Sequence, residues 1–125
     1  MTDTQKLDAI DNLIAAVEVG DATLGFFDDV FEVSPTGVSA IGAYNGSLDA
    51  ALTLHNALLT GYAVDPISIW DGCPTSVRIL ETHKEEDGTY WHSFKDGLFE
   101  AESDTPTRAW LLAILKAYRS KVEKE

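Results

Sequence analysis

The segment TPTRAWLLAILKAYRS, residues 105–120, limits the possible folds more than any other part of the chain. Thr105 is a good helix N-cap, and Pro106 follows at the first helical position, where a missing N–H costs nothing. Apolar residues then cover a wide arc of the helix: Ala109, Leu111, Leu112, Ile114, Leu115 and Tyr118. A face this wide is typical of a helix that packs across a sheet. We therefore predict a long C-terminal helix as a main packing element.

Three further helices are predicted upstream. Before Gly20, apolar residues recur at helical spacing: Leu7, Ile10, Leu13, Ile14 and Val17. DATLGFFDDVFEV, residues 21–33, favours a short helix, although a strand also fits its pattern. Ser47 is an N-cap for a helix that ends at Gly61 and carries an apolar stripe of Leu48, Leu52, His55 and Leu59. We expect His55, on that stripe, to be partly buried and hydrogen-bonded rather than catalytic.

The other segments favour short strands. SPTGVSAIGAYNG, residues 34–46, predicts a turn, a strand over 38–44 and a second turn. YAVDPISIW, residues 62–70, is rich in strand formers, and Pro66 places it at an edge, a bulge or a break. Another strand is expected over 98–101. The chain is long enough for one domain, 1–125, of the α+β class, with a small, mostly antiparallel sheet covered by helices as an α/β/α-type sandwich.

RILETHKEEDGTYWHSF, residues 78–94, predicts a β-hairpin with an acidic tip around an Asp-Gly pair. A two-residue turn would place His83 opposite His92, and a three-residue loop would put the two on opposite faces. A four-residue loop would pair Glu81 with His92 and Ile79 with Phe94. That register aligns apolar with apolar side chains, so we favour it.

Two groups of residues are candidate binding sites. On the hairpin these are Glu81, His83, Glu85, Glu86, Asp87, Tyr90, Trp91 and His92. In FFDDVFE, acidic residues lie among aromatics, and the candidates are Asp28, Asp29 and Glu32. The simpler alternative for the hairpin is a solvated tip with ordinary cross-strand pairs. Two histidines with one carboxylate are an incomplete ligand set, so we predict no metal site.

The sequence holds no recognisable catalytic or cofactor motif. It lacks a Gly-rich phosphate loop, and Cys73 has no basic neighbour or helix N-terminus to lower its pKa. We expect no enzymatic activity and no cofactor. The single cysteine cannot form an internal disulfide, and neither a signal peptide nor an apolar run of ~20 residues is visible, so we expect a cytoplasmic protein.

Charge narrows the choice of partner. The formal net charge is -12, and no Lys or Arg occurs between Lys6 and Arg78. This charge argues against direct nucleic-acid binding and against anionic membranes. An acidic excess can simply keep a protein soluble, but it can also imitate nucleic-acid phosphates and occupy a basic groove of another protein.

Two segments carry a resemblance to a family. AYNGSLDAALTLHNALL, residues 43–59, and TPTRAWLLAILKAYRS, on either side of a strand-rich middle, resemble the phage ABA-sandwich domain proteins, small proteins common in phages and prophages. The matching positions are Tyr44, Ser47, Leu48, Asp49, Ala50, Ala51 and Leu52, then Thr105, Pro106 and Ala109. These are helix-start and core positions, so the resemblance implies a fold and a phage origin but no catalytic residues.

The function we expect is that of a non-enzymatic phage or prophage accessory protein that binds a host or phage macromolecule. One form is an acidic inhibitor of a host defence or DNA-processing protein. The alternative is a small-molecule binder, such as a sponge for a signalling nucleotide, with a pocket drawn from Trp70, Tyr90, Trp91, Arg78, Lys95 and Arg108. A hydrolase or metalloenzyme would require His83 and His92 to converge with a carboxylate.

Overall fold

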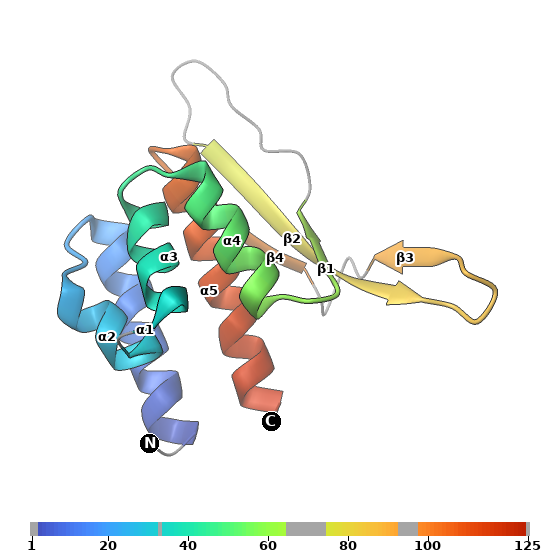
Figure 1. Cartoon of the computed structure of the whole chain (residues 1–125), viewed down its shortest axis with the longest axis horizontal. Coiled ribbons are helices and arrows are strands. Elements are labelled where there is room, and N and C mark those ends of the chain that lie inside the picture. Colours follow the sequence, from blue (N-terminus) through green and yellow to red (C-terminus); the bar gives the residue numbers. More distant parts are fainter. Residues whose placement is uncertain (1–2, 33, 65–74, 93–97, 125) are drawn as a thin grey trace.

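The computed structural model describes residues 3–32, 34–64, 75–92 and 98–124 (Figure 1). Within these ranges the helices are α1 (Asp3–Val19), α2 (Leu24–Phe31), α3 (Pro35–Tyr44), α4 (Leu48–Leu58) and α5 (Pro106–Lys124). The strands are β1 (Tyr62–Val64), β2 (Thr75–Lys84), β3 (Tyr90–His92) and β4 (Leu98–Ser103). The predicted α+β class, with a small antiparallel sheet and a long C-terminal helix, is confirmed. None of the described helices is long and apolar enough to cross a membrane.

Strand β2 is the centre of the sheet. It pairs antiparallel with β4 along its first part, from Thr75 opposite Ser103 to Leu80 opposite Leu98. It also pairs with β1 through residues 79–81 and with β3 through its last three residues. Ile79 therefore lies between Val64 and Phe99, so its apolar neighbours come from β1 and β4.

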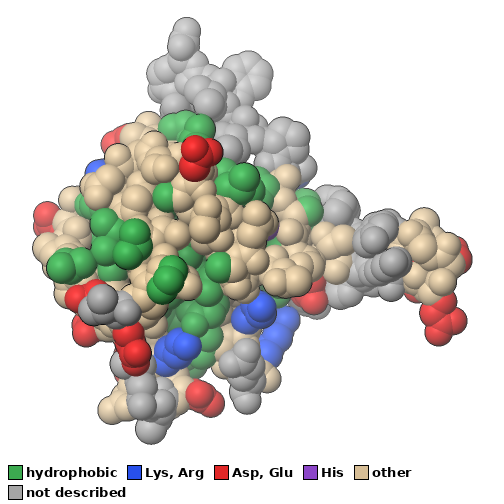
Figure 2. Space-filling model, viewed as in Figure 1, with side chains coloured by type: hydrophobic (Ala, Val, Ile, Leu, Met, Phe, Trp, Pro, Cys, Tyr) green, Lys and Arg blue, Asp and Glu red, His purple; other side chains and the backbone are tan. Residues whose placement is uncertain are grey.

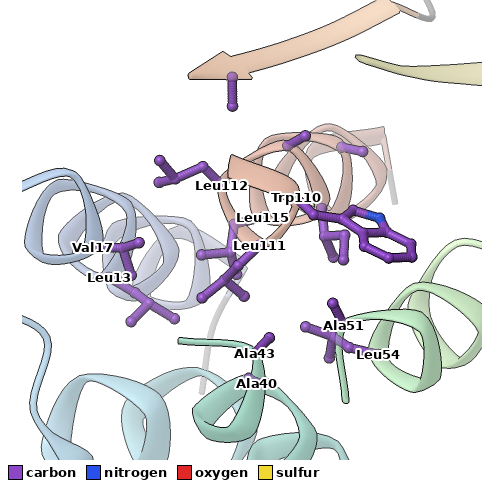
Figure 3. Packing of buried hydrophobic residues seen from close by; sticks show 14 of the residues in the cluster. Leu13, Val17, Ala40, Ala43, Ala51, Leu54, Trp110, Leu111, Leu112 and Leu115 are labelled. Carbon is purple, nitrogen blue, oxygen red and sulfur yellow. The ribbon is translucent and has the colours of Figure 1, made fainter. Parts of the chain in front are cut away.

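Helix α5 lies between the sheet and the other helices (Figure 3). Every residue from Ala109 to Leu115 is buried. A helix that is apolar around its whole circumference must be enclosed on all sides, which is a stronger condition than the broad face seen in the sequence. In Figure 3, β4 lies on one side of α5, while Leu13 of α1 and Leu54 of α4 lie on the other. In the described part, the layers follow the order sheet, α5, remaining helices.

Side chains begin two of the helices, α4 and α5, as the sequence predicts. The Ser47 hydroxyl accepts from the Ala50 N–H at 3.1 Å, and the Thr105 hydroxyl accepts from the Arg108 N–H at 3.3 Å. Each bond satisfies an N–H that has no partner inside the helix. The short helix expected in residues 21–33 is confirmed as α2.

The strand predicted over 38–44 is wrong, because these residues form most of α3. Ser34 accepts from the Gly37 N–H at 3.2 Å, and Pro35 occupies the first turn, so this helix starts in the same way as α5. Gly37, Ala40 and Ala43 are its buried residues, and their spacing of three is that of one helix face. Tertiary packing of these small residues outweighs the strand propensity of their neighbours.

The apolar stripe predicted on α4 is also wrong in part. Leu48 and Leu52 are 51% and 48% exposed, whereas Ala51, Leu54 and His55 are buried. The helix is therefore rotated from the predicted orientation, because the smaller Ala51 allows α4 to approach its neighbours. Cys73 and residues 65–70 of the segment 62–70 lie outside the described residues.

Candidate functional site

The hairpin of β2 and β3 projects from the body of the molecule (Figure 1), and Asp and Glu side chains lie at its end (Figure 2). The Glu85 N–H donates to the Thr89 carbonyl at 2.8 Å, and the Gly88 N–H donates to the Glu85 carbonyl at 3.0 Å. Gly88 has φ +91°, a conformation that suits glycine. The carboxylate of Asp87 accepts from the hydroxyl and the N–H of Thr89, and these bonds lower the pKa of Asp87.

The predicted four-residue loop is wrong. The register pairs Thr82 with His92, His83 with Trp91 and Lys84 with Tyr90, and a three-residue loop closes it. The reason lies in the turn itself. Gly88 is the third loop residue and has a left-handed backbone conformation, which is the usual way to close a three-residue hairpin loop.

The predicted pairs are therefore replaced by others. Glu81 pairs with Tyr62 rather than His92, and Ile79 finds apolar neighbours outside the hairpin. Phe94 lies outside the described residues. The two histidines are not opposite each other, and among the described residues no three His, Cys, Asp or Glu side chains are grouped closely enough to hold a metal ion.

The second candidate group lies at the C-terminal end of α2. Asp29 and Glu32 are exposed, whereas Asp28 is half-buried. The C-terminal end of a helix carries partial negative charge, so each carboxylate here is unfavourable by roughly 0.3–1 kcal/mol. The last turn of α2 contains no basic residue that would offset this repulsion. The acids are therefore placed where they do not help α2 to form.

Glu32 also has an unusual backbone. Its φ of 57° and ψ of -169° fall in a region that is occupied almost only by glycine. A residue held there costs roughly 1–3 kcal/mol. The start of α3 packs closely against this turn, since a Cβ on Gly37 would lie 2.9 Å from the Glu32 carbonyl oxygen.

The last turn of α2 opens onto a cleft of about 410 Å³, which we call the α2–α5 cleft. It is lined by Lys6, Asp29, Val30, Phe31, Glu32, Ser34, Thr36, Leu58 and Tyr118. In the lower part of the face drawn in Figure 2, hydrophobic side chains lie in a recess with charged side chains around it.

An aromatic pair with a cation forms part of the lining of this cleft. Phe31 and Tyr118 stack with ring centroids 5.9 Å apart and an interplanar angle of 27°. The Lys6 ammonium lies 5.3 Å from the centroid of the Tyr118 ring, which is within cation–π range. Sequence reasoning had identified Asp29 and Glu32 but missed Lys6 and Tyr118, because no local pattern connects two residues from opposite ends of the chain.

The hairpin and the α2–α5 cleft are not brought together. In Figure 1, α2 lies at the lower left, whereas the hairpin extends to the right. The protein therefore presents two separate acidic surfaces.

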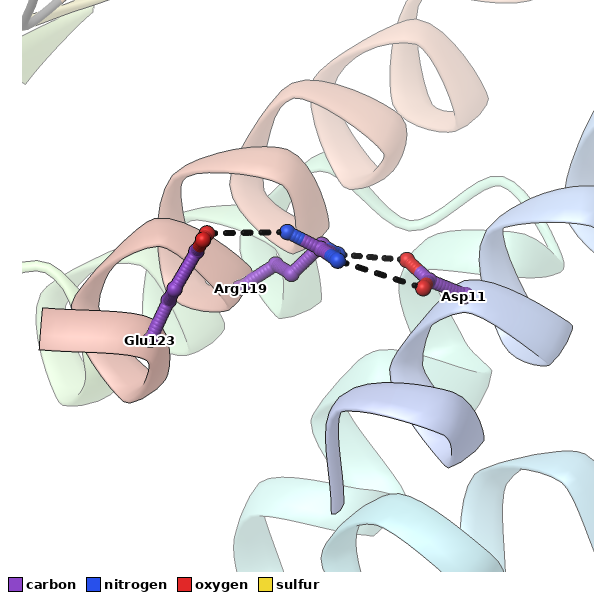
Figure 4. A network of polar contacts seen from close by, with 3 residues as sticks. All are labelled: Asp11, Arg119 and Glu123. Atoms are coloured by element: carbon purple, nitrogen blue, oxygen red, sulfur yellow. Dashed lines mark hydrogen bonds and ion pairs between the residues drawn. The ribbon is translucent and has the colours of Figure 1, made fainter. Parts of the chain in front are cut away.

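Many basic side chains are held by groups of the protein itself. Lys116 and Lys121 donate to the carbonyls of Glu100 and Leu58, at 3.1 and 2.9 Å. Arg119 joins Asp11 of α1 to Glu123, and its hydrogen bond with Asp11 raises the pKa of Arg119 (Figure 4).

Arg108 completes this set, because it donates to the Tyr44 carbonyl at 3.1 Å. With Lys6 over Tyr118, the set within the described residues contains Lys6, Arg108, Lys116, Arg119 and Lys121. Of the described acidic side chains, in contrast, all but Asp28 and Glu81 are exposed.

His55 lies in the core and not in either site. Its Nε2 lies 3.0 Å from the Tyr62 carbonyl, which can only accept, so Nε2 carries the proton. Burial lowers the pKa of His55. The prediction of a buried, hydrogen-bonded histidine is confirmed, although its Nδ1 and the Nε1 of the adjacent Trp110 have no hydrogen-bond partner in the described part of the structure.

The residues predicted for a small-molecule pocket do not form one described group. Arg108 is engaged by Tyr44, and Trp70 and Lys95 lie outside the described residues. Arg78 already takes part in a polar or ring interaction within the protein. Comparisons with protein-family models, with curated proteins and with solved structures find no match for this chain.

Proposed function

We propose that this protein is a non-enzymatic accessory protein, of the kind that phages and prophages encode, which binds a macromolecule that carries a basic surface. The observation that supports this proposal is the unequal use of the two charges. Basic side chains are engaged by carbonyls, carboxylates and an aromatic ring of the protein, whereas nearly all described acidic side chains face solvent. A basic partner that approaches therefore meets mainly exposed carboxylates.

The hairpin suits such a contact. Glu85, Glu86 and Asp87 are exposed at the end of an arm that stands away from the body (Figure 1). The bonds between Asp87 and Thr89 give the tip a defined shape, so little conformational entropy is lost when a partner binds. One form of this function is occupation of the nucleic-acid groove of a host defence or DNA-processing protein in the host cytoplasm.

The experiment that tests this proposal is affinity capture from bacterial lysate at 50 and 300 mM salt, with bound proteins quantified by mass spectrometry. We expect enrichment of basic proteins at low salt and strong loss at high salt. A triple variant of the tip, Glu85→Gln, Glu86→Gln and Asp87→Asn, should lose these proteins.

The matched control removes the same charge from other exposed positions through Glu18→Gln, Asp21→Asn and Glu102→Gln. If both triple variants lose binding equally, binding depends on net charge alone and the hairpin tip has no specific role. A large thermal shift with a nucleotide in place of protein binding would instead favour the small-molecule alternative.

A further inference from the structure

We propose that the α2–α5 cleft binds a cationic side chain of the partner, arginine in the first place, through the Tyr118 ring and the carboxylates of Asp29 and Glu32. This assignment rests on the proposed function and names the chemistry that a basic partner would use. The cleft volume of about 410 Å³ lies within the range of pockets that hold small ligands, roughly 300–1,000 Å³.

The ring of Tyr118 is held in position by one contact and already binds a cation through another. One of its contacts is the stack with Phe31, which is itself buried at 8% exposure and so holds the ring in place. Another is the ammonium of Lys6, at 5.3 Å from the ring centroid. The protein's own lysine thus marks where a cation is favourable, and a guanidinium would gain more there because it is planar and more weakly hydrated.

The acids add the charge that such a ligand needs. Asp29 and Glu32 border the cleft, and Lys6 is the basic member of the described residues that line it. Asp29 also borders a neighbouring hollow of about 480 Å³ between α1 and α2, lined by Gln5, Asp8, Ala9 and Asn12. A cation that enters along this side passes exposed carboxylates before it reaches the ring.

Lys6 is then an internal competitor of the ligand. When the partner's guanidinium stacks on Tyr118, the Lys6 ammonium leaves the ring and is hydrated, which costs little because Lys6 is half-exposed at its position on α1. This arrangement makes a prediction with a definite sign. If the cleft takes a cation, removal of Lys6 strengthens binding, and if it takes an anion, the same change weakens binding.

The test uses the full chain and a fluorescein-labelled, acetylated octa-arginine peptide, with fluorescence anisotropy at 50 mM salt. The same peptide with citrulline, which has the shape of arginine without its charge, controls for apolar binding. We expect Lys6→Ala to tighten binding by about threefold or more beyond the effect of Lys116→Ala. Lys116 is a matched control because it carries the same charge but donates to the backbone carbonyl of Glu100 in β4.

Two further variants locate the cation. Glu32→Gln should weaken binding by about threefold or more beyond Glu100→Gln, which removes the same charge from an exposed position on β4. Tyr118→Leu, which keeps apolar volume but removes the ring, should abolish the gain from Lys6→Ala in the double variant. Circular dichroism of each variant confirms that it is folded.

The possible results separate the two proposals. If octa-arginine does not bind, or citrulline binds equally well, both the proposed function and the cleft assignment fail. If octa-arginine binds but Lys6→Ala and Glu32→Gln match their controls, the cleft assignment fails and the proposed function stands. Weaker binding by Lys6→Ala than by Lys116→Ala overturns a cation site in this cleft.

Discussion

The guanidinium of Arg108 lies over the ring of Tyr44, with 4.3 Å between its central carbon and the ring centroid, while its Nε donates to the Tyr44 carbonyl at 3.1 Å. The first turn of α5 is thereby joined to the last residue of α3. A carbonyl in the last turn of a helix lacks a partner within that helix, and here a cation supplies one at the negative end of the helix dipole.

Arg108→Lys is expected to lower the free energy of unfolding by about 1–2 kcal/mol, because an ammonium cannot both stack as a plane and donate from the same position. Urea denaturation measures this loss. Tyr44→Phe keeps the ring and the carbonyl, so its stability should stay within about 0.5 kcal/mol of the parent chain. A larger loss from Tyr44→Phe than from Arg108→Lys would show that the contact is not the cause.

The approach of α3 to α4 depends on Gly42. A Cβ at this position would lie 2.8 Å from the Cβ of Ala50, closer than two such atoms can pack. Gly42→Ala should therefore destabilise the protein by about 1 kcal/mol or more, although alanine is the better helix former. We expect the exchange Gly42→Ala with Ala50→Gly to recover most of this loss. Additive effects of the two single changes in denaturation experiments would contradict the close contact.

Glu32→Gly should stabilise the protein by about 1 kcal/mol, because glycine adopts the backbone conformation of this residue without strain. Thermal and urea denaturation measure the gain. Glu32→Ala is the matched control, since it removes the same charge but keeps a Cβ. Equal stabilisation by both variants would assign the effect to charge at the end of α2 and not to φ. Both variants should bind the octa-arginine peptide more weakly.

Stability should depend on pH through His55. Burial lowers the pKa of this histidine in the folded protein below its usual 6.5. Between the pKa of His55 in the folded protein and its pKa in the unfolded chain, the unfolded chain binds more protons. The contribution of His55 to the free energy of unfolding is therefore fully present above about pH 6.5 and is lost as the pH falls through the folded pKa. We expect the urea midpoint to fall from pH 8 to pH 5.

His55→Gln removes this titration while an amide can still donate toward the Tyr62 carbonyl. Its urea midpoint should therefore fall less over the same pH range. All other ionisable groups are common to both proteins, so the difference between the curves reports His55 alone. Parallel curves would be inconsistent with a histidine kept neutral by burial.

Local chemistry explains which parts of the fold could be predicted. Ser47 and Thr105 start their helices through bonds to the N–H three residues ahead, and this pattern is visible in sequence. Ser34 and Pro35 carry the same pattern, but the β-branched valine and isoleucine of α3 favour a strand. The prediction failed where two local signals disagreed, and packing against α4 decided between them.

The hairpin was predicted, but its register was not. Matching Ile79 with Phe94 assumed that the hairpin itself supplies the apolar partner. In the structure that partner comes from β1 and β4, and the turn at Gly88 is free to set the register of the tip. Sequence periodicity cannot tell which of several strands will lie beside a residue.

The sequence by itself determined the starts of α4 and α5, the α+β class and the acidic surface, because each depends on neighbouring residues or on composition. Only the tertiary structure decided that Lys6 meets Tyr118 and that Phe31 supports the same ring. These residues come from α1, α2 and α5, and their meeting depends on how α5 is enclosed by the helices around it. Contacts between distant residues follow from packing, and packing is a property of the whole chain.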